Sequence, residues 1–424
     1  MSRVFVRRCI GIVALCWCLP AAARVQAGQP APHDHTQMQH DMPASWHLMQ
    51  DGIVYAEFNH QGGPRGGDEF VAPNWWMGMA TRPVRRSELT FTAMLSLDAA
   101  TVGKNGYGEI FQVGEALDGR PLVDRQHPHD LFMQLAAIWK TPVSATTSLT
   151  LAGGPVGEPA LGPVAFMHRP SAAEIPFAAL GHHVFDSTHI AFGVVTAAVQ
   201  RGRWTVEGSV FNGREPDEDR WDFDPGKLDS VSGRLWFRPN ERWELQASTG
   251  HLSEPEELEP GDVQRTTASA AWFKVNGEDF SAVTAGYGVN VAHGTHRQSV
   301  FAEATRRSGK NSIFGRAELV EVETAKLLDA DHHSAEESPA KNTVGGFTGG
   351  AVRDFLRWRG FEAGVGASVT FYAVPDVLKP THGSHPVSYQ LFFRLRPPTG
   401  GMGRMWNMRM SRPMSAAAMQ MQHH

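Results

Sequence analysis

The chain has 424 residues, with 39 lysine and arginine residues against 44 aspartate and glutamate residues and a formal net charge of −5. This negative balance argues against a nucleic-acid partner, because nucleic-acid-binding domains carry basic surfaces. Past the first 27 residues no apolar run reaches 18 residues, so the sequence offers no transmembrane helix there. A chain with 43 glycines and 12 tryptophans can still cross a membrane as a closed β-barrel.

Residues 1–27 have the pattern of a secretory signal peptide. Arg3, Arg7 and Arg8 precede the apolar run 9–19, and the small residues at 25–27 fit a cleavage site. All three cysteines lie in this segment, so the mature chain has no thiolate for metal or nucleophilic chemistry. The segment also holds four of the 39 basic residues and no acidic ones, which gives a mature net charge of −9.

Residues 28–51 and 397–424 are rich in methionine and histidine, and we expect both segments to be disordered. The candidate metal ligands in them are His33, His35, Met38, His40, Met42, Met402, Met405, Met408 and Met410. Thioethers and imidazoles together suit soft cations, so the sequence predicts copper binding by the two ends of the mature chain. The alternative is low-complexity sequence without a ligand.

Between these ends, residues 52–396 contain sixteen segments that alternate apolar and polar side chains. They are 52–60, 74–82, 88–98, 130–140, 145–153, 188–200, 204–212, 230–237, 242–250, 264–275, 279–290, 298–307, 312–323, 343–357, 361–372 and 386–396. Such alternation predicts β-strands with two different faces. The connections alternate between short turns and long loops; the long ones are 61–73, 99–129, 154–187, 213–229, 251–263, 291–296, 324–342 and 373–385.

This rhythm predicts an all-β fold, an antiparallel transmembrane β-barrel of about 16 strands (14–18) in the outer membrane, with short periplasmic turns and long extracellular loops. In 361–371 the odd positions are all Phe, Ala or Val, which would face lipid, while the even ones are polar or small and would face the lumen. An even strand number places both termini in the periplasm. The alternative is a soluble exported sandwich or solenoid, and the absence of a fixed-period repeat counts against the solenoid.

Fourteen histidines lie in or beside the long loops, and two groups of them, at 125–130 and 181–189, stand out. These groups cap neighbouring strand pairs, so we expect them to meet at the mouth of the barrel. Imidazole is the commonest transition-metal ligand. The candidate ligands in the loops are His127, His129, Asp130, His168, His182, His183, Asp186 and His189. The alternative is that loops are simply where polar residues lie.

Three further loop features bear on function. The loop 154–187 is apolar and rich in proline, and we expect it to fold inward and narrow the pore. The loop 211–224 is acidic, and Asp217, Glu218, Asp219, Asp222 and Asp224 are candidates for calcium, although a solvated surface is favoured. Ser187 near His189 is the neighbouring pair that a barrel lipase would need.

The segment 124–235 carries a resemblance to known proteins through DRQHPHDLF, GEPALGPVAFMHRPSA, LGHH, FNGREPDEDRWDFD and DSVSGRL. It resembles a family of predicted bacterial outer-membrane β-barrels of unassigned role, which implies the fold and the location. The Met/His-rich termini are similar to those of copper-resistance proteins of the outer membrane and periplasm.

Together these features favour an outer-membrane channel that handles metal ions, copper first, and that is not an enzyme. The expected partners are outer-membrane lipid and a metal ion or small solute, with no nucleic acid, and the oligomeric state is open between monomer and trimer. One alternative is a general or small-solute porin whose histidines are incidental. Another is a barrel enzyme with a His/Asp metal site on its loops.

Overall fold

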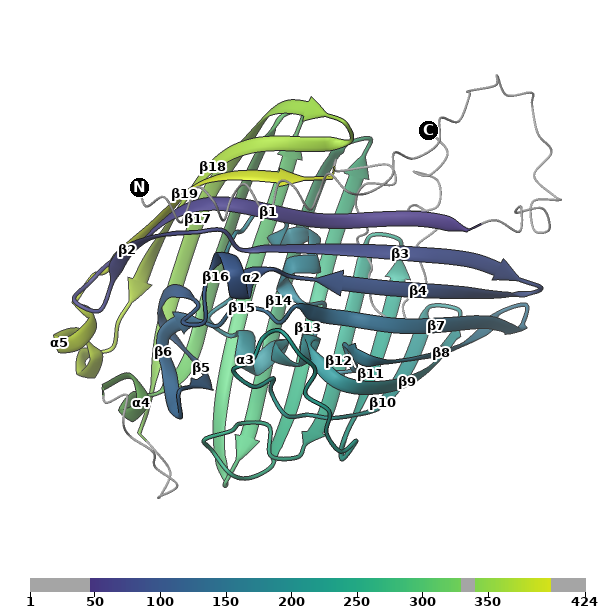
Figure 1. The fold of residues 1–424 in the computed structure, drawn as a ribbon, viewed down its shortest axis with the longest axis horizontal. Helices are drawn as coiled ribbons and strands as arrows, with labels where there is room; N and C mark the ends of the chain where they lie inside the picture. Colours follow the sequence, from purple (N-terminus) through teal and green to yellow (C-terminus); the bar gives the residue numbers. More distant parts are fainter. Residues whose placement is uncertain (1–45, 329–339, 398–424) are drawn as a thin grey trace.

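The computed structural model describes residues 46–328 and 340–397, and its strands form one closed barrel (Figure 1). The barrel positions are, in chain order, β1 (His47–Gln61), β3 (Asn74–Val84), β4 (Ser87–Leu95), β7 (Phe132–Ser144), β8 (Thr147–Gly157), β9 (Ala191–Arg201), β10 (Trp204–Phe211), β11 (Ser230–Asn240), β12 (Trp243–Leu252), β13 (Val263–Asn276), β14 (Asp279–Ala292), β15 (Thr295–Ser308), β16 (Asn311–Glu323), β17 (Lys341–Trp358), β18 (Phe361–Ala373) and β19 (Val387–Arg396). The predicted signal peptide, most of the leader and most of the tail lie outside the described residues.

Closure comes from the pairing of β1 with both β19 and β3, and every strand pair is antiparallel. The sheet has 17 strands, but β2 (Gly67–Val71) pairs with the end of β1 while β3 pairs with its start. Since β2 and β3 share one position, the barrel has sixteen. The predicted closed antiparallel transmembrane barrel of about 16 strands is therefore confirmed. Strand β1 begins at His47 rather than at residue 52, so the end of the predicted leader is part of the wall.

The connections alternate as the sequence predicts, with one exception. Two-residue turns at 85–86, 145–146, 202–203, 241–242, 277–278, 309–310 and 359–360 all lie at one end of the barrel, where β1 starts and β19 finishes. The prediction of a long loop at 291–296 is wrong. This connection is a two-residue turn on the other end, at His293 and Gly294, whose φ values of 48° and 74° suit a tight hairpin.

The connection expected as a loop at 99–129 contains structure that the sequence pattern does not predict. It begins with α2 (Asp98–Thr101) and continues into a hairpin of β5 (Tyr107–Leu117) and β6 (Arg120–Gln126). This hairpin is a separate two-stranded sheet with two register shifts. Bulges break the period-2 alternation that marks a strand, so the pattern was lost there.

The two faces of the wall meet different surroundings. In β18 the odd positions Val365 and Phe371 are exposed, while Glu362 and Ser368 are buried inside the barrel. Trp204, Trp243 and Trp358 are exposed beside three of the two-residue turns, which is the girdle that aromatic side chains form at a membrane interface. None of the helices in the described ranges is long and apolar enough to cross a membrane.

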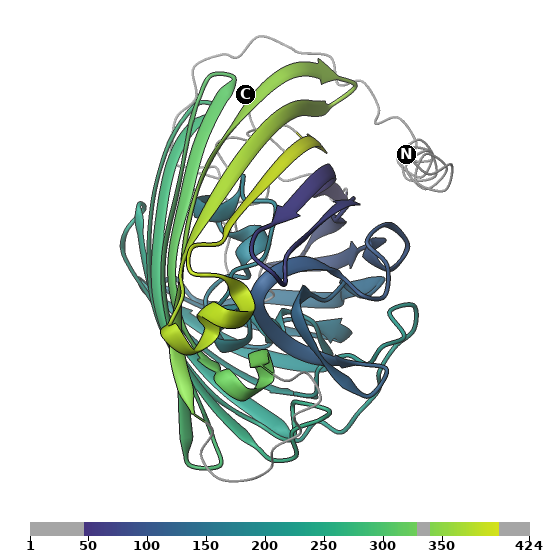
Figure 2. The same cartoon turned by 90° about the vertical axis from the view of Figure 1, so that its left-hand side faces the viewer.

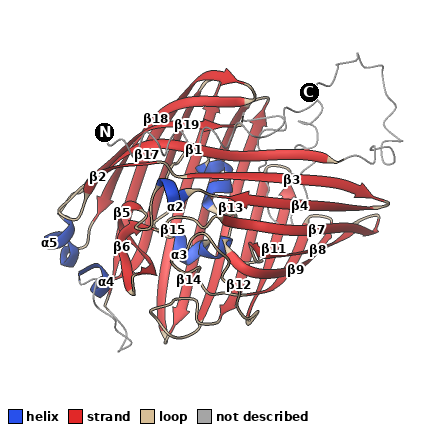
Figure 3. Cartoon of the chain, viewed as in Figure 1, coloured by secondary structure: helices blue, strands red, loops and turns tan. Residues whose placement is uncertain are grey.

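The connection 158–190 folds into the barrel, as its composition predicts. It carries η1 (Phe166–His168), η2 (Pro170–Ala172), α3 (His182–Phe185) and η3 (Ser187–His189). Nearly all of its residues are buried, and η2 contacts the inner face of β14, β15 and β16. Figures 2 and 3 show the helices of this connection inside the ring of strands. In contrast, α4 (Thr324–Leu328), η4 (Asp376–Leu378) and α5 (Lys379–His382) lie at the end of the barrel opposite the seven two-residue turns, which we call the loop end.

Buried ion pairs hold this connection in place. Arg169 lies 2.6 Å from Glu303 of β15, and Glu174 pairs with Arg394 at 3.1 Å and with Arg396 at 2.9 Å on β19. Arg394 and Arg396 lie near the two-residue turns, so the connection reaches from the loop end deep into the lumen. A buried charge is tolerated only when it is paired, and these pairs therefore fix the path of the chain.

Candidate functional site

The two groups of histidines predicted to meet at the barrel mouth do come together, inside the loop end. We call His127, His129, His182, His183 and His189 the histidine cluster. Their ring centres form a closed circuit of 129–189 at 5.6 Å, 189–182 at 5.2 Å, 182–183 at 5.3 Å, 183–127 at 5.8 Å and 127–129 at 6.3 Å. The rings are largely shielded from solvent.

Short local elements position these rings. His182 and His183 open the single turn of α3, and His189 closes η3 after the intervening Asp186. His127 and His129 follow β6 directly, on either side of Pro128. The proline restricts the residue before it to extended conformations, which suits a rigid link between the hairpin and β7.

Each ring is oriented through its Nδ1 atom. The contacts are His129 to Asp98 Oδ2 at 2.8 Å, His182 to Asp186 Oδ1 at 2.8 Å, His183 to Glu215 Oε1 at 3.1 Å, His127 to Glu115 Oε1 at 3.2 Å and His189 to the Asp186 carbonyl oxygen at 2.9 Å. A carboxylate or carbonyl on one ring nitrogen fixes the tautomer and leaves the other nitrogen as an acceptor.

The other ring nitrogen, Nε2, is buried and has no hydrogen-bond partner in any of the five residues. The His183 ring packs closely against Gly114, because a Cβ atom at that position would lie 2.1 Å from this nitrogen. A buried acceptor without a partner costs about 1–3 kcal/mol. Five of them in one cluster fit a transition metal, whose imidazole ligands are held through the opposite nitrogen.

Burial also keeps most of these rings neutral, which is the form that binds metal. It lowers the pKa of His127 well below the usual value, helped by the Arg220 guanidinium. Burial likewise lowers the pKa of His189, together with the neighbouring imidazoles. For His183 burial acts in the same direction, but the Glu215 carboxylate outweighs it and raises the pKa.

The other predicted loop ligands take different roles. Asp186 joins His182 to Arg169, whose Nη1 donates to it at 2.8 Å. Asp130 is buried against Arg220 at 3.4 Å, and burial raises the pKa of Asp130 to about 6 despite that cation. His168 packs edge-on against Trp75 at 4.9 Å between ring centres and is not part of the circuit.

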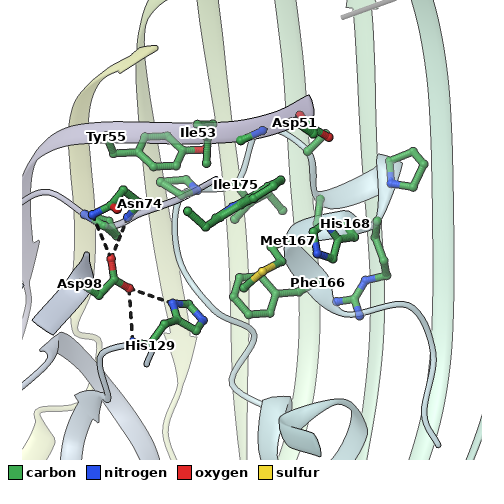
Figure 4. Close-up of a pocket in the computed structure, with 18 of the residues that line it drawn as sticks. Asp51, Ile53, Tyr55, Asn74, Asp98, His129, Phe166, Met167, His168 and Ile175 are labelled. Atoms are coloured by element: carbon green, nitrogen blue, oxygen red, sulfur yellow. Dashed lines mark hydrogen bonds and ion pairs between the residues drawn. The ribbon is translucent and has the colours of Figure 1, made fainter. Parts of the chain in front are cut away.

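A small cavity adjoins the cluster at His129. Its volume is about 60 Å³, and it lies between the inner face of β1 and β3 and the inward connection. Figure 4 shows His129 bound to Asp98 on one side of this space and Met167 and His168 on the other. The space suits an ion or a few water molecules rather than an organic solute.

Three acidic residues that the sequence did not single out complete the site. Glu115 lies in the unpredicted hairpin β5–β6, and Glu215 and Glu256 lie in the connections 212–229 and 253–262. His183, Glu215 and Glu256 place one ligand atom each within 4.8 Å of one another. Among the described residues no three histidines form so tight a group, so one ion would have to draw the rings of the cluster inward. The positions of Glu115, Glu215 and Glu256 relative to the histidines could be found only from the fold.

The acidic loop and the Ser187–His189 pair are the other two features that the sequence singles out within the described residues. Asp217, Asp222 and Asp224 form a second group within 4.8 Å, mostly exposed, and Glu218 and Asp219 are not part of it. The Ser187 hydroxyl accepts a hydrogen bond from Arg265 at 3.0 Å, and His189 Nδ1 faces a carbonyl, so the two do not act on each other. The terminal candidates at 33–42 and 402–410, and His332 and His333, lie outside the described residues.

Comparison with known proteins identifies the fold. No family model matches the chain, copper-resistance families included, and no curated protein matches it. The anion-selective porin from Comamonas acidovorans is similar, with 10% identity, 83% of this chain and 100% of that chain covered, and a TM-score of 0.50. OprB from Pseudomonas putida has 10% identity, covers 83% and 94%, and has a TM-score of 0.50. OmpT, an outer-membrane protein of Vibrio cholerae, has 9% identity, covers 84% and 99%, and has a TM-score of 0.50. At these identities the likeness is one of fold.

Proposed function

We propose that this chain is an outer-membrane barrel that binds a transition-metal ion, copper first, at the histidine cluster. The observation that carries the proposal is the state of the five imidazoles, each held at Nδ1 and unpaired at a buried Nε2. Ligands of this kind suit copper, zinc and nickel rather than magnesium or calcium.

The spacing and charge of the cluster support this assignment. Two imidazoles on one tetrahedral ion have ring centres about 5 Å apart. His182 approaches this distance to both His183 and His189, at 5.3 and 5.2 Å. The carboxylates of Asp98 and Asp186 lie behind the rings and balance part of the positive charge of an ion.

A general or small-solute porin is the second candidate, and the barrel architecture that the chain shares with porins favours it. The inward connection argues for a narrow passage, because it lies inside the lumen and its Arg169 and Glu174 pair with charges of the wall. Under this candidate the histidines are structural and the barrel conducts without metal. The Met/His-rich ends of the mature chain remain a separate proposal for copper capture on the periplasmic side.

Metal binding to the purified mature barrel in detergent tests the proposal. We expect Cu(II) and Zn(II) to quench the tryptophan fluorescence, and His182→Ala together with His189→Ala to abolish binding at the histidine cluster. His296→Ala is the control, because His296 is exposed and outside the cluster. Deleting 398–424 separates binding by the tail from binding by the cluster. Equal metal affinity in the double variant, with metal-independent conductance in planar bilayers, would favour the porin instead.

A further inference from the structure

One imidazole of the histidine cluster also belongs to a second group of ligand atoms. His183, Glu215 and Glu256 come from three different connections, yet their ligand atoms lie within 4.8 Å of one another. The backbone builds this group, because the Glu215 amide donates to the Pro255 carbonyl oxygen at 2.9 Å and so places Glu215 beside Glu256.

The cations near Glu256 are paired directly with other acids. Lys326 pairs with Glu259 and with Glu323, at 2.9 Å to the latter, and Arg297 pairs with the same two acids. Glu256 makes no hydrogen bond or ion pair within the described part of the chain.

Glu215 is also incompletely satisfied. Its Oε1 faces His183, but its Oε2 is buried without a partner. Two adjacent carboxylates repel each other, and a cation bound between them relieves this repulsion. An arrangement of two carboxylates and one imidazole is a donor set for a divalent cation.

We propose that His183, Glu215 and Glu256 form a second divalent-cation site, which receives Zn(II) or Cu(II) from solvent and passes it to the histidine cluster. This inference rests on the proposed function, because it takes the cluster as the final binding site. His183 is shared, since it belongs to the histidine cluster and its Nδ1 faces Glu215. When both ions are bound, His183 bridges them as an imidazolate and its ring N–H proton is released to solvent.

Burial and donor type give the transfer its direction. The side chains of His183 and Glu215 are 12% exposed, whereas that of the neighbouring His182 is 0% exposed. Mixed oxygen and nitrogen donors at the rim exchange an ion more readily than a buried all-imidazole cluster, which holds copper and zinc more firmly. The ion keeps its oxidation state, and carboxylate ligands are replaced by imidazoles one at a time.

Metal titration of the full mature barrel with Zn(II) or Cu(II) alone tests this inference. At these two sites we expect two ions per chain in the wild type, one in Glu256→Gln and one in His189→Ala. His189 lies in the cluster but outside the acidic group. Ions bound by the Met/His-rich ends are common to all variants and cancel in these differences. Stopped-flow loading should be about tenfold slower in Glu256→Gln, while the affinity of the cluster is unchanged. Glu257→Gln is the matched control, because Glu257 is an exposed neighbour.

The spectrum of bound Cu(II) adds a readout that misfolding would not imitate. The ion left in His189→Ala should show one nitrogen ligand, and the ion left in Glu256→Gln should show at least three. Unchanged stoichiometry and loading in Glu256→Gln, with one ion lost in His189→Ala, would overturn the second site and leave the proposed function standing. No binding by the wild type would overturn both. Loss of all binding in Glu256→Gln would make the glutamates part of the cluster itself and so overturn a separate site.

Discussion

The lumen contains two groups of buried polar side chains that are built in opposite ways. We call the first the charged network; it comprises Arg169, Glu174, Glu303, Arg316, Arg394 and Arg396, and each charge lies within 4 Å of an opposite one. The second is the histidine cluster, in which every ring pairs one nitrogen and leaves the other without a partner.

The charged network therefore acts as a tether that holds the inward connection in place, whereas the histidine cluster is arranged as a binding site. Each charge of the charged network has an opposite charge beside it, so ion pairing fixes the inward connection without needing a ligand. The histidine cluster retains unused acceptors, which water or a metal ion has to satisfy. Asp186 joins the two, because it accepts hydrogen bonds from both Arg169 and His182 at 2.8 Å. The tether therefore also orients one ring of the site.

The largest expected effect comes from breaking the charged network at Glu303. Glu303→Gln leaves Arg169 and Arg316 without their shared carboxylate. Removing one partner of a buried pair costs about 3–5 kcal/mol, so we expect the free energy of unfolding to fall by that amount. The inward connection should also loosen, which would raise single-channel conductance in planar bilayers. Glu241→Gln, at an exposed turn, is the control, and unchanged stability and conductance would show that the network is not the tether.

A slightly smaller effect is expected on the outer face of the wall. Leu391→Arg places a charge at an exposed apolar position of β19, between the two ends of the strand. An arginine facing the middle of the bilayer costs about 2–4 kcal/mol, which urea unfolding in lipid vesicles measures. Leu228→Arg, at an exposed position of the connection 212–229, is the control and should be neutral. Equal stability of the two variants would argue that this face does not meet lipid.

Weakening the orientation of one ring should change metal binding more than stability. Asp98→Asn keeps the size of the side chain but removes the charge that holds His129 Nδ1 at 2.8 Å. Loss of such a supporting carboxylate typically lowers metal affinity about 10–100-fold. Competition titration with a Zn(II) chelator measures this change. Asp229→Asn, which affects a pair with Arg214 in another part of the loop end, is the control. An unchanged affinity would exclude His129 from the ligand set.

The barrel was predictable from the sequence because its signal is local. Alternation along single strands such as β18 and the regular two-residue turns identify the wall without any knowledge of pairing. The hairpin β5–β6 was not predictable, since its bulges disrupt that alternation. His293–Gly294 was mistaken for part of a loop because it lacks the usual Asn-Gly pair of such turns.

The site was only partly predictable, for a different reason. Histidines near 127 and 182 were expected to meet, because their connections cap neighbouring strands. The roles of Glu215 and Glu256 depend on how three connections pack over the lumen, and neither residue has a local signal. Whether a buried Nε2 has a partner depends on all the surrounding side chains, which a one-dimensional pattern does not contain.

The smallest effect is expected at an exposed histidine outside the histidine cluster. His251 Nε2 lies 3.3 Å from Asp262 Oδ2, so this ring has a carboxylate contact, as four rings of the histidine cluster do through Nδ1. Both side chains are about half exposed, however, at 45% and 51%. Water can satisfy the second nitrogen of His251, and exposed pairs contribute less than about 1 kcal/mol. His251→Ala should therefore change neither metal affinity nor the free energy of unfolding by more than that. A large loss of metal binding in this variant would mean that an imidazole beside a carboxylate is sufficient, and that burial of the unpaired nitrogen is not what defines the site.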